Sequence, residues 1–399
     1  MSGYGIEDLA HAPNALAEHY SRFRVTERLL LTGHSHQAWP DVALEGQIEA
    51  ATDAAEYVDG KWDRAAAKAE EVADGYRRLL GDPGGEIALG ASTHDLVLRF
   101  LSALDLRRRP RLVTTDGEFH TLRRQLGRLA EEGIEVVRVP AEPADTLAER
   151  IASEVDDGTA AALVSLVLFE TARIVDGLDV VAAACARQGA ELLVDAYHAL
   201  GVVEVDLAAL GLSDAWVTGG GYKYLQLGEG NCFLRLPPHA DRFRPVITGW
   251  FAEFGELAEE KSPGLVRYPN GAGRYAGSTY DPTSHYRAAR VLRFRDEHGL
   301  VPAFLRELAQ HQLGVLATTF DELALPSDVV TRDRMAPLSE YGGFLALRCR
   351  DAQGLQAALG ERGVRTDARG AYLRFGPAPY LSDTQLTDAM ASLGEIVRG

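Results

Sequence analysis

Short apolar runs alternate with longer helical patterns between about residue 80 and residue 240 of the chain. Helical spacing is clearest at 46–80, where Gly60 and Gly75 are candidate breaks, and it returns in TLAERIASEVDD and GLDVVAAACARQG. Such alternation is typical of a mostly parallel sheet with helices on both faces, so the sequence predicts an α/β fold. The predicted strands are EIALG, RLVTTD, EVVRVP, AALVSLVLF, AELLVDA, AWVTGG and CFLRLP.

The pattern changes twice toward the C-terminus. Residues 240–285 are irregular and rich in glycine, proline and aromatic side chains, which favours a functional loop region. A long helix, TSHYRAARVLRFRDEHGL, then leads to strands at GFLALRC and AYLRFG with helices after each. We therefore predict an N-terminal arm at 1–35, a large domain at 36–285 and a smaller α+β domain at 286–399.

The composition excludes several classes of partner. The formal net charge is −17 and the pI is about 5.1, whereas nucleic acids and anionic membranes require basic patches, so we expect neither as a partner. The longest uncharged apolar run, at 161–169, is too short to span a bilayer. Cys185, Cys232 and Cys349 are few and far apart, which argues against a disulfide framework or a zinc cluster. We expect a cytoplasmic protein.

Lysine is rare in this chain, which has four lysines among its 41 Lys and Arg residues. Lys223 lies in VTGGGYKYLQLGEG, directly after a predicted strand, where ligands of open parallel sheets bind. A deprotonated lysine can form a Schiff base with a carbonyl compound, and a guanidinium cannot. The ordinary interpretation is a surface lysine in a glycine-rich loop, so a catalytic role for Lys223 needs support from other residues.

Two further segments supply that support. Asp195 closes the strand ELLVD, and a carboxylate buried there needs a compensating partner such as a protonated pyridine nitrogen. Ser92 and Thr93 precede a predicted helix, whose N-terminus can bind a phosphate, although helix capping explains the same two residues. A strand-end carboxylate, a phosphate-binding turn and a lysine after a later strand are together what pyridoxal phosphate requires.

The segments GYKYL, DAYH, ITGWFAEF and LRFGPAPY resemble those of kynureninase and its relatives among the class V aminotransferase-like enzymes, which have fold type I. The resemblance extends from about residue 30 to residue 385 and implies a pyridoxal-phosphate enzyme that forms a homodimer. It implies that Lys223 forms the Schiff base, that Asp195 pairs with the pyridine nitrogen and that His198 supports Asp195 or the oxygen of the ring. The other cofactor contacts that it implies are Phe119, Thr121, Tyr222, Trp250, Ser278 and Thr279, with Trp250 supplied by this chain or by the neighbouring subunit.

The resemblance also implies a substrate pocket that differs from the family pattern. Arg374 in LRFGPAP matches the arginine that binds the α-carboxylate of the substrate, a role suited to its planar fork of donors. His34 and His36 replace an asparagine and a leucine of the family turn, and Asp281 stands where a substrate-binding asparagine is expected. We expect all three in the substrate pocket. Two histidines without a third ligand more often line a pocket than hold a metal, so no metal site is predicted.

Three reactions on an α-amino acid remain open. The first is that of a lyase or hydrolase of the kynureninase kind, acting on a reactive group at Cβ or Cγ. The second is C–S cleavage, or decarboxylation-dependent deamination, of an S-conjugated cysteine in secondary metabolism, as in related enzymes of lincosamide pathways. The third is transamination. Residues 363–375 contain no cysteine, so desulfuration through a cysteine persulfide is not expected. A cofactor-free binding relative is disfavoured because Lys223, Asp195 and Arg374 are all present.

Overall fold

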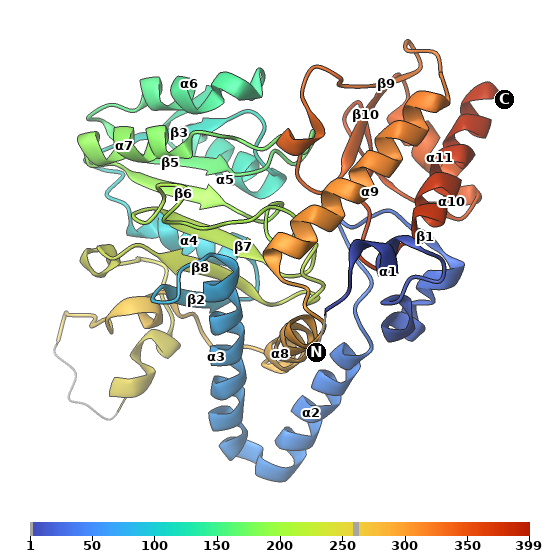
Figure 1. Ribbon diagram of the computed structural model, residues 1–399. Coiled ribbons are helices and arrows are strands. Elements are labelled where there is room, and N and C mark those ends of the chain that lie inside the picture. Colours follow the sequence, from blue (N-terminus) through green and yellow to red (C-terminus); the bar gives the residue numbers. More distant parts are fainter. Residues whose placement is uncertain (1–2, 258–262) are drawn as a thin grey trace.

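The computed structural model describes residues 3–257 and 263–399. The strands at its centre are β2 (Glu86–Gly90), β3 (Arg111–Thr115), β4 (Glu135–Val139), β5 (Thr159–Ser165), β6 (Glu191–Asp195), β7 (Trp216–Gly220) and β8 (Cys232–Leu236). They form one seven-stranded sheet in the order β2-β8-β7-β6-β5-β3-β4 (Figure 1). Strand β8 is antiparallel to both of its neighbours, and the remaining pairs are parallel. The predicted strands and the mostly parallel α/β fold are confirmed.

Helices cover both faces of this sheet (Figure 1). On one face, α4 (Thr93–Ala103) and α5 (His120–Glu131) bury Phe100 and Leu126 in a core that includes Trp216 of β7. The core of the other face includes residues of α3 (Lys61–Leu79), α6 (Leu147–Glu154) and α7 (Leu178–Gln188). Strands β5 and β7 are buried along their whole length, which is why they read as continuous apolar runs in the sequence.

The carboxyl edge of the sheet gathers polar strand ends. Thr115, Ser165 and Asp195 close β3, β5 and β6, which are neighbours in the sheet. Gly220 closes β7, and Cys232 opens the reversed strand β8 opposite it. A ligand at this edge therefore meets residues from several strands at once.

A second core joins the two ends of the chain. Its strands are β1 (Leu29–Leu30), β9 (Val330–Arg332), β10 (Leu345–Cys349), β11 (Val364–Arg365), β12 (Asp367–Arg369) and β13 (Tyr372–Phe375). Its helices are α1 (Ile6–Ala10), α9 (Pro302–Glu322), α10 (Ala352–Glu361) and α11 (Asp383–Arg398). Strands β12-β13-β10-β9 form an antiparallel sheet, and β1 pairs in parallel with β11. Leu9, Leu16 and Tyr20 from the N-terminal arm are buried in the same core.

The helices depart from the prediction in three places. The 46–80 pattern forms α2 (Val42–Tyr57) and α3 with a break near Gly60, but Gly75 lies inside α3. There it lets α3 approach α8 (Thr283–Glu297), because a Cβ on Gly75 would meet Leu292 at 2.5 Å. Helix α9 was not predicted. The predicted domain boundary after residue 285 falls inside α8, which contributes Ala288 to the sheet core and Phe294 to the second core.

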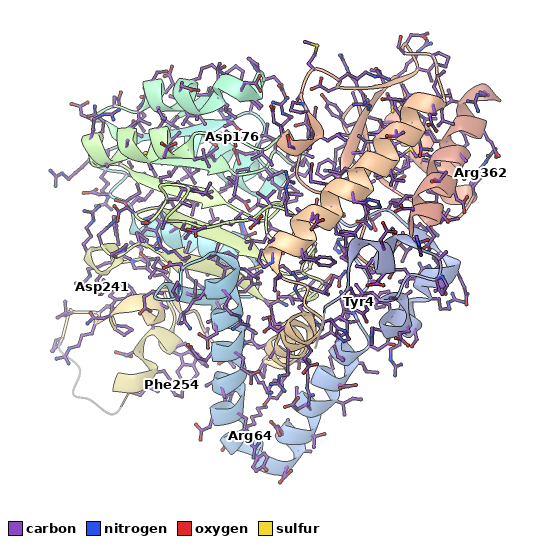
Figure 2. The ribbon with its side chains drawn as sticks, viewed as in Figure 1. Tyr4, Arg64, Asp176, Asp241, Phe254 and Arg362 are labelled. Atoms are coloured by element: carbon purple, nitrogen blue, oxygen red, sulfur yellow. The ribbon has the colours of Figure 1, made fainter. Side chains whose placement is uncertain are left out.

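The irregular region expected at 240–285 contains short 3-10 turns in its described part. Phe254 lies in one of them and is half exposed, and Figure 2 shows it at the lower left, beneath the edge of the sheet that β2 forms. In the described ranges, no helix is both long and apolar enough to cross a membrane. The 3-10 turns are η1 (Ala17–Phe23), η2 (Val25–Glu27), η3 (Val58–Gly60), η4 (Ala144–Thr146), η5 (Ala240–Arg242), η6 (Trp250–Glu256), η7 (Gly271–Tyr275) and η8 (Leu338–Glu340).

Candidate active site

A cavity of about 270 Å³ lies at the carboxyl edge of the sheet. The turn before α4, the loop before α5, the end of β6 and the segment between β7 and β8 form its walls. The residues that line it are Ala91, Ser92, Thr93, His94, Val97, Phe119, Thr121, Leu122, Asp195, Tyr197, His198, Tyr222, Lys223, Glu229, Gly230 and Cys232.

Lys223 and His198 meet inside this cavity. Lys223 is 4% exposed, and its Nζ lies 2.7 Å from Nε2 of His198. Burial lowers the pKa of Lys223 to about 7, against the opposing charge of Asp195. Burial also lowers the pKa of His198 well below its ordinary value, and the charge of Lys223 lowers it further. Near neutral pH a substantial fraction of Lys223 is therefore the uncharged amine, the form that attacks a carbonyl carbon.

Asp195 faces the same cavity from the end of β6. Its Oδ1 accepts a hydrogen bond of 2.8 Å from the backbone N–H of Tyr197, which fixes the carboxylate at the strand end. Burial raises the pKa of Asp195, whereas the N–H of Tyr197 and the charge of Lys223 lower it. A proton donor or a cation that entered the cavity beside Asp195 would offset the cost of burying this charge.

The N-terminus of α4 forms a third wall. Ser92 is the N-cap, and its Oγ accepts a hydrogen bond of 3.2 Å from the backbone N–H of Asp95. Thr93 and His94 begin the helix and line the cavity. The free N–H groups and the dipole at the start of a helix attract a phosphate, so this wall fits the phosphate group of pyridoxal phosphate. Lys223 fits its aldehyde, and Asp195 fits its ring nitrogen.

Aromatic rings form the remaining walls around the lysine. Nζ of Lys223 lies 5.1 Å from the ring centre of Phe119 and 4.8 Å from that of Tyr197. The rings of Tyr197 and Tyr222 are 5.1 Å apart. A cavity bounded by aromatic faces suits a flat, ring-shaped ligand.

The structure brings one group of the expected site residues into one cavity and adds residues that we did not expect. The expected residues that line it are Ser92, Thr93, Phe119, Thr121, Asp195, His198, Tyr222 and Lys223. Tyr197, Glu229 and Cys232 also line it and were not predicted. The position of Tyr197 inside the DAYH segment was a usable signal, because residues just after a strand end face the same edge as the strand end itself. No comparable signal marked Glu229 or Cys232.

Arg374 lies behind the cavity, on β13. It is 3% exposed, and its Nη2 donates a hydrogen bond of 2.7 Å to Oδ1 of Asp367, while its Nη1 donates to the carbonyl oxygen of Phe169. Nε of Arg374 is buried and has no hydrogen-bond partner among the described residues. The positive charge of Arg374 lowers the pKa of both Lys223 and His198, which places it close to these two side chains.

His34 and His36 occupy different environments. His34 is 1% exposed and packs on the ring of Phe344 at 4.6 Å, and neither of its ring nitrogens has a partner among the described residues. His36 lies at the rim of the cavity, where it stacks on Tyr222 at 5.0 Å and its Nδ1 lies 3.5 Å from Oε1 of Glu229. Neither histidine is among the residues that line the cavity.

The expected residues from the 245–285 region lie outside the cavity of this chain. Nε1 of Trp250, which is 42% exposed, donates a hydrogen bond of 3.2 Å to Oγ1 of Thr279. Ser278 precedes Thr279 beside Gly277, which approaches Arg99 of α4. Oδ1 of Asp281 accepts a hydrogen bond of 2.9 Å from the backbone N–H of Thr283 at the start of α8. In a single chain, Asp281 therefore serves the start of a helix.

The cysteines are poor nucleophiles. Cys185, Cys232 and Cys349 are all buried, and burial raises the pKa of each thiol, to about 12 for Cys185 and to about 11 for the other two. A thiol is nucleophilic as the thiolate, so these thiols are unreactive near neutral pH. Within residues 3–257 and 263–399, no group of three or more His, Cys, Asp or Glu side chains is arranged to hold a metal ion.

No protein-family model matches the chain. The uncharacterized aminotransferase YcbU of Bacillus subtilis (strain 168) is 24% identical over 245 residues, which are 61% of this chain. The matched part spans 63% of the length of that relative.

Solved structures share the whole fold at low sequence identity. C-DES with glycine covalently linked to its PLP cofactor gives a TM-score of 0.83 at 14% identity and covers 95% of this chain and 98% of its own. The complex of the cystine C–S lyase C-DES with its product cysteine persulfide gives 0.82 at 15% identity, with coverage of 93% and 98%. The apo cysteine desulfurase of Thermococcus onnurineus NA1 gives 0.78 at 16% identity, with coverage of 98% and 99%. The chain therefore has the fold of the PLP-dependent enzymes of fold type I.

Proposed function

We propose that this chain is a pyridoxal-phosphate-dependent lyase that acts on α-amino acids carrying a leaving group at Cβ. The observation that carries the proposal is the buried amine of Lys223, held 2.7 Å from Nε2 of His198 in a cavity that also contains Asp195 and the start of α4. Buried groups with strongly shifted pKa values cluster at functional sites, which favours a chemical role for Lys223.

Each wall of the cavity has a part in this proposal. Pyridoxal phosphate, when bound, supplies an electron sink that makes the Cα proton of an amino acid acidic. The amine of Lys223 then takes that proton, and His198 at its side keeps the amine oriented. Asp195 holds the proton on the ring nitrogen, and the hydroxyls of Ser92 and Thr93 with the start of α4 hold the phosphate.

Elimination at Cβ is the reaction that these residues can complete with the fewest additional groups. Lys223 takes the Cα proton, and a thiolate leaves Cβ. The three-carbon amino acid that remains is unsaturated, and water hydrolyses it to pyruvate and ammonia. No reactive cysteine is needed, which agrees with the raised pKa values of the three thiols. Two proteins with the same fold are a cystine C–S lyase and a cysteine desulfurase, and by analogy with them we favour a sulfur leaving group.

Hydrolytic cleavage of the kynureninase kind is the second candidate, and transamination the third. The kynureninase-like segments favour the second candidate, but Asp281, expected in the substrate pocket, instead accepts a hydrogen bond at the start of α8. Arg374 serves all three candidates, because each acts on a substrate with an α-carboxylate.

The deciding experiment is a spectrum and a product assay on one preparation. The purified protein with pyridoxal phosphate should show a visible absorbance band that K223R, which keeps the positive charge, lacks. L-Cystine and S-conjugated cysteines should then yield pyruvate, and L-kynurenine should yield no anthranilate. Anthranilate release would instead support the second candidate, and a protein without a band would overturn the assignment of the cofactor.

A homodimer is part of this proposal. Trp250 donates a hydrogen bond to Thr279 outside the cavity of their own chain. The neighbouring apolar side chains of Val246, Phe254 and Val266 are exposed. We propose that this region completes the site of a second copy of the chain. Sedimentation analysis of the protein at micromolar concentration tests it, and a monomer that is fully active would contradict it.

A further inference from the structure

Glu118 is a buried carboxyl group beside the candidate active site, outside the lining of the cavity. It is 1% exposed and precedes Phe119 in the loop between β3 and α5. Its Oε1 accepts hydrogen bonds from Oγ1 of Thr115 at 2.8 Å and from the backbone N–H of Ser165 at 3.1 Å. Its Oε2 accepts a hydrogen bond from Oγ of Ser165 at 2.6 Å. Both oxygens are thus held at the carboxyl ends of two neighbouring strands.

Ser165 brings this carboxyl group next to Asp195. Ser165 in β5 and Asp195 in β6 are register partners in adjacent parallel strands, and the backbone N–H of Leu166 donates to the carbonyl oxygen of Asp195 at 2.9 Å. Register partners on adjacent strands project their side chains to the same face of a sheet, about 5 Å apart. The carboxyl group of Glu118, bound to Ser165, therefore lies on the same face as the carboxylate that faces the cavity.

Among the described residues, Glu118 forms no ion pair with a lysine, arginine or histidine. The groups that face it are neutral hydroxyls and an amide from β3 and β5, together with the charge of Asp195 from β6. Burial raises the pKa of Glu118 to about 7, and the charge of Asp195 contributes to that rise. Because a Coulomb interaction acts on both partners, an ionised Glu118 in turn disfavours the charge of Asp195.

We infer that Glu118 is a positioning residue that adjusts the negative charge available to the ring nitrogen of the cofactor through Asp195. This inference rests on the proposed function. With Glu118 neutral, Asp195 is the one of these two carboxyl groups that carries a negative charge. With Glu118 ionised, a second negative charge lies behind Asp195, and the pair holds a proton on the ring nitrogen more tightly.

The test compares the wild type with E118Q, which keeps the shape of the side chain but cannot ionise. Its Oε1 can still accept from Thr115 and from the backbone N–H of Ser165, whereas its Nε2 must donate to Oγ of Ser165 where Oε2 accepted. The dissociation constant of pyridoxal phosphate and the visible absorbance of the bound cofactor are measured for both proteins from pH 5.5 to pH 8.5. The ratio of the two dissociation constants should change across this range as Glu118 ionises, by about tenfold for each pKa unit of coupling between Glu118 and the bound cofactor. The titration of the cofactor band should shift to lower pH in E118Q.

A second variant separates ionisation from loop anchoring. T115V removes one hydrogen bond that favours the ionised form of Glu118, so its affinity change should occur at a higher pH than in the wild type. A role in anchoring the loop alone predicts parallel pH curves for the wild type and E118Q. Parallel curves would overturn the inference and leave the proposed function in place. Absence of a cofactor band in the wild type would overturn both.

Discussion

Nζ of Lys223 lies 2.7 Å from Nε2 of His198, and both groups are buried at the carboxyl edge of a mostly parallel sheet. Two cationic groups at this distance cannot both keep their protons in a buried site. The pair therefore contains a free base near neutral pH, which is what proton removal from a substrate requires.

Replacing Lys223 by arginine should abolish covalent attachment of pyridoxal phosphate while keeping the positive charge. Turnover should fall by about 10²- to 10⁴-fold, because both the nucleophile and the base are lost. Borohydride reduction followed by mass spectrometry of the peptide that contains residue 223 checks the attachment. Labelling of the wild type at Lys61 or Lys68 in its place would contradict the assignment.

The rate of cofactor attachment should depend on pH in a specific window. The folded-state pKa of Lys223 is about 7, so the fraction of free amine rises as the pH increases through 7 and then levels off. Stopped-flow measurement of the visible band after mixing cofactor-free protein with pyridoxal phosphate gives this curve. A rate that continues to rise toward pH 10 would indicate an ordinary, exposed lysine.

Variants of Ser92 and Thr93 should distinguish a loss of folding stability from a loss of cofactor affinity. S92A removes the N-cap of α4 and should lower the free energy of unfolding by about 1 kcal/mol, besides weakening cofactor affinity. T93V should weaken cofactor affinity with little change in stability, because Thr93 is not the cap. Thermal unfolding without cofactor and a cofactor titration measure the two effects. Equal stability loss in both variants would argue against this division.

Arg374 should act on substrates through their α-carboxylate. R374K keeps the charge but loses the planar fork of donors, and it should raise KM by roughly 10- to 100-fold, as expected for a lost charged hydrogen bond. The kcat should change less. The matched control is a substrate analogue without the carboxylate, which should bind both proteins equally. An equal loss for the analogue would mean that Arg374 supports the fold through Asp367 and does not contact the substrate.

Glu118 should make the free energy of unfolding depend on pH even without cofactor. Between its ordinary pKa of 4.5 and its folded-state pKa of about 7, the folded chain retains a proton that the unfolded chain has released. Its contribution to stability is therefore lost as the pH rises through this window. Relative to E118Q, the wild type should lose up to about 3 kcal/mol between pH 4.5 and pH 8. Denaturant unfolding of the two cofactor-free proteins at several pH values measures this difference.

The sequence predicted the sheet, and it predicted residues that the structure brings together in one cavity, because both depend on local patterns. Strand ends are visible where an apolar run meets a polar residue, so Asp195 and the loop that contains Lys223 were found without contacts. Helix α9 was missed although its buried side chains recur at helical spacing, so the sequence carried a usable signal there; they are Leu305, Leu308, Ala309, Gln312, Leu313, Leu316, Ala317 and Phe320. Glu118 could not be found, since its burial depends on Ser165, which is 47 residues away.

The expected site residues that lie outside the cavity could not be placed from local sequence patterns. Trp250, Thr279 and Asp281 were assigned by resemblance to segments of a family, and a resemblance does not state which chain of an assembly a residue serves. Their place away from the cavity of their own chain is a property of three-dimensional packing. Only a measurement on the assembled protein tests their proposed role.

The reversed direction of β8 has a consequence for Lys223. Because β7 and β8 are antiparallel neighbours, residues 221–231 leave and re-enter the sheet at the same edge, as the arch of a wide hairpin. Asn231 braces this arch by donating to the carbonyl oxygens of Leu227 and Gly228, at 3.1 and 2.9 Å. A parallel strand in its place would have required a crossover that carried the chain away over one face. The hairpin instead anchors the segment 221–231 to the sheet at both ends, so the backbone that carries Lys223 is held at this edge before any ligand arrives.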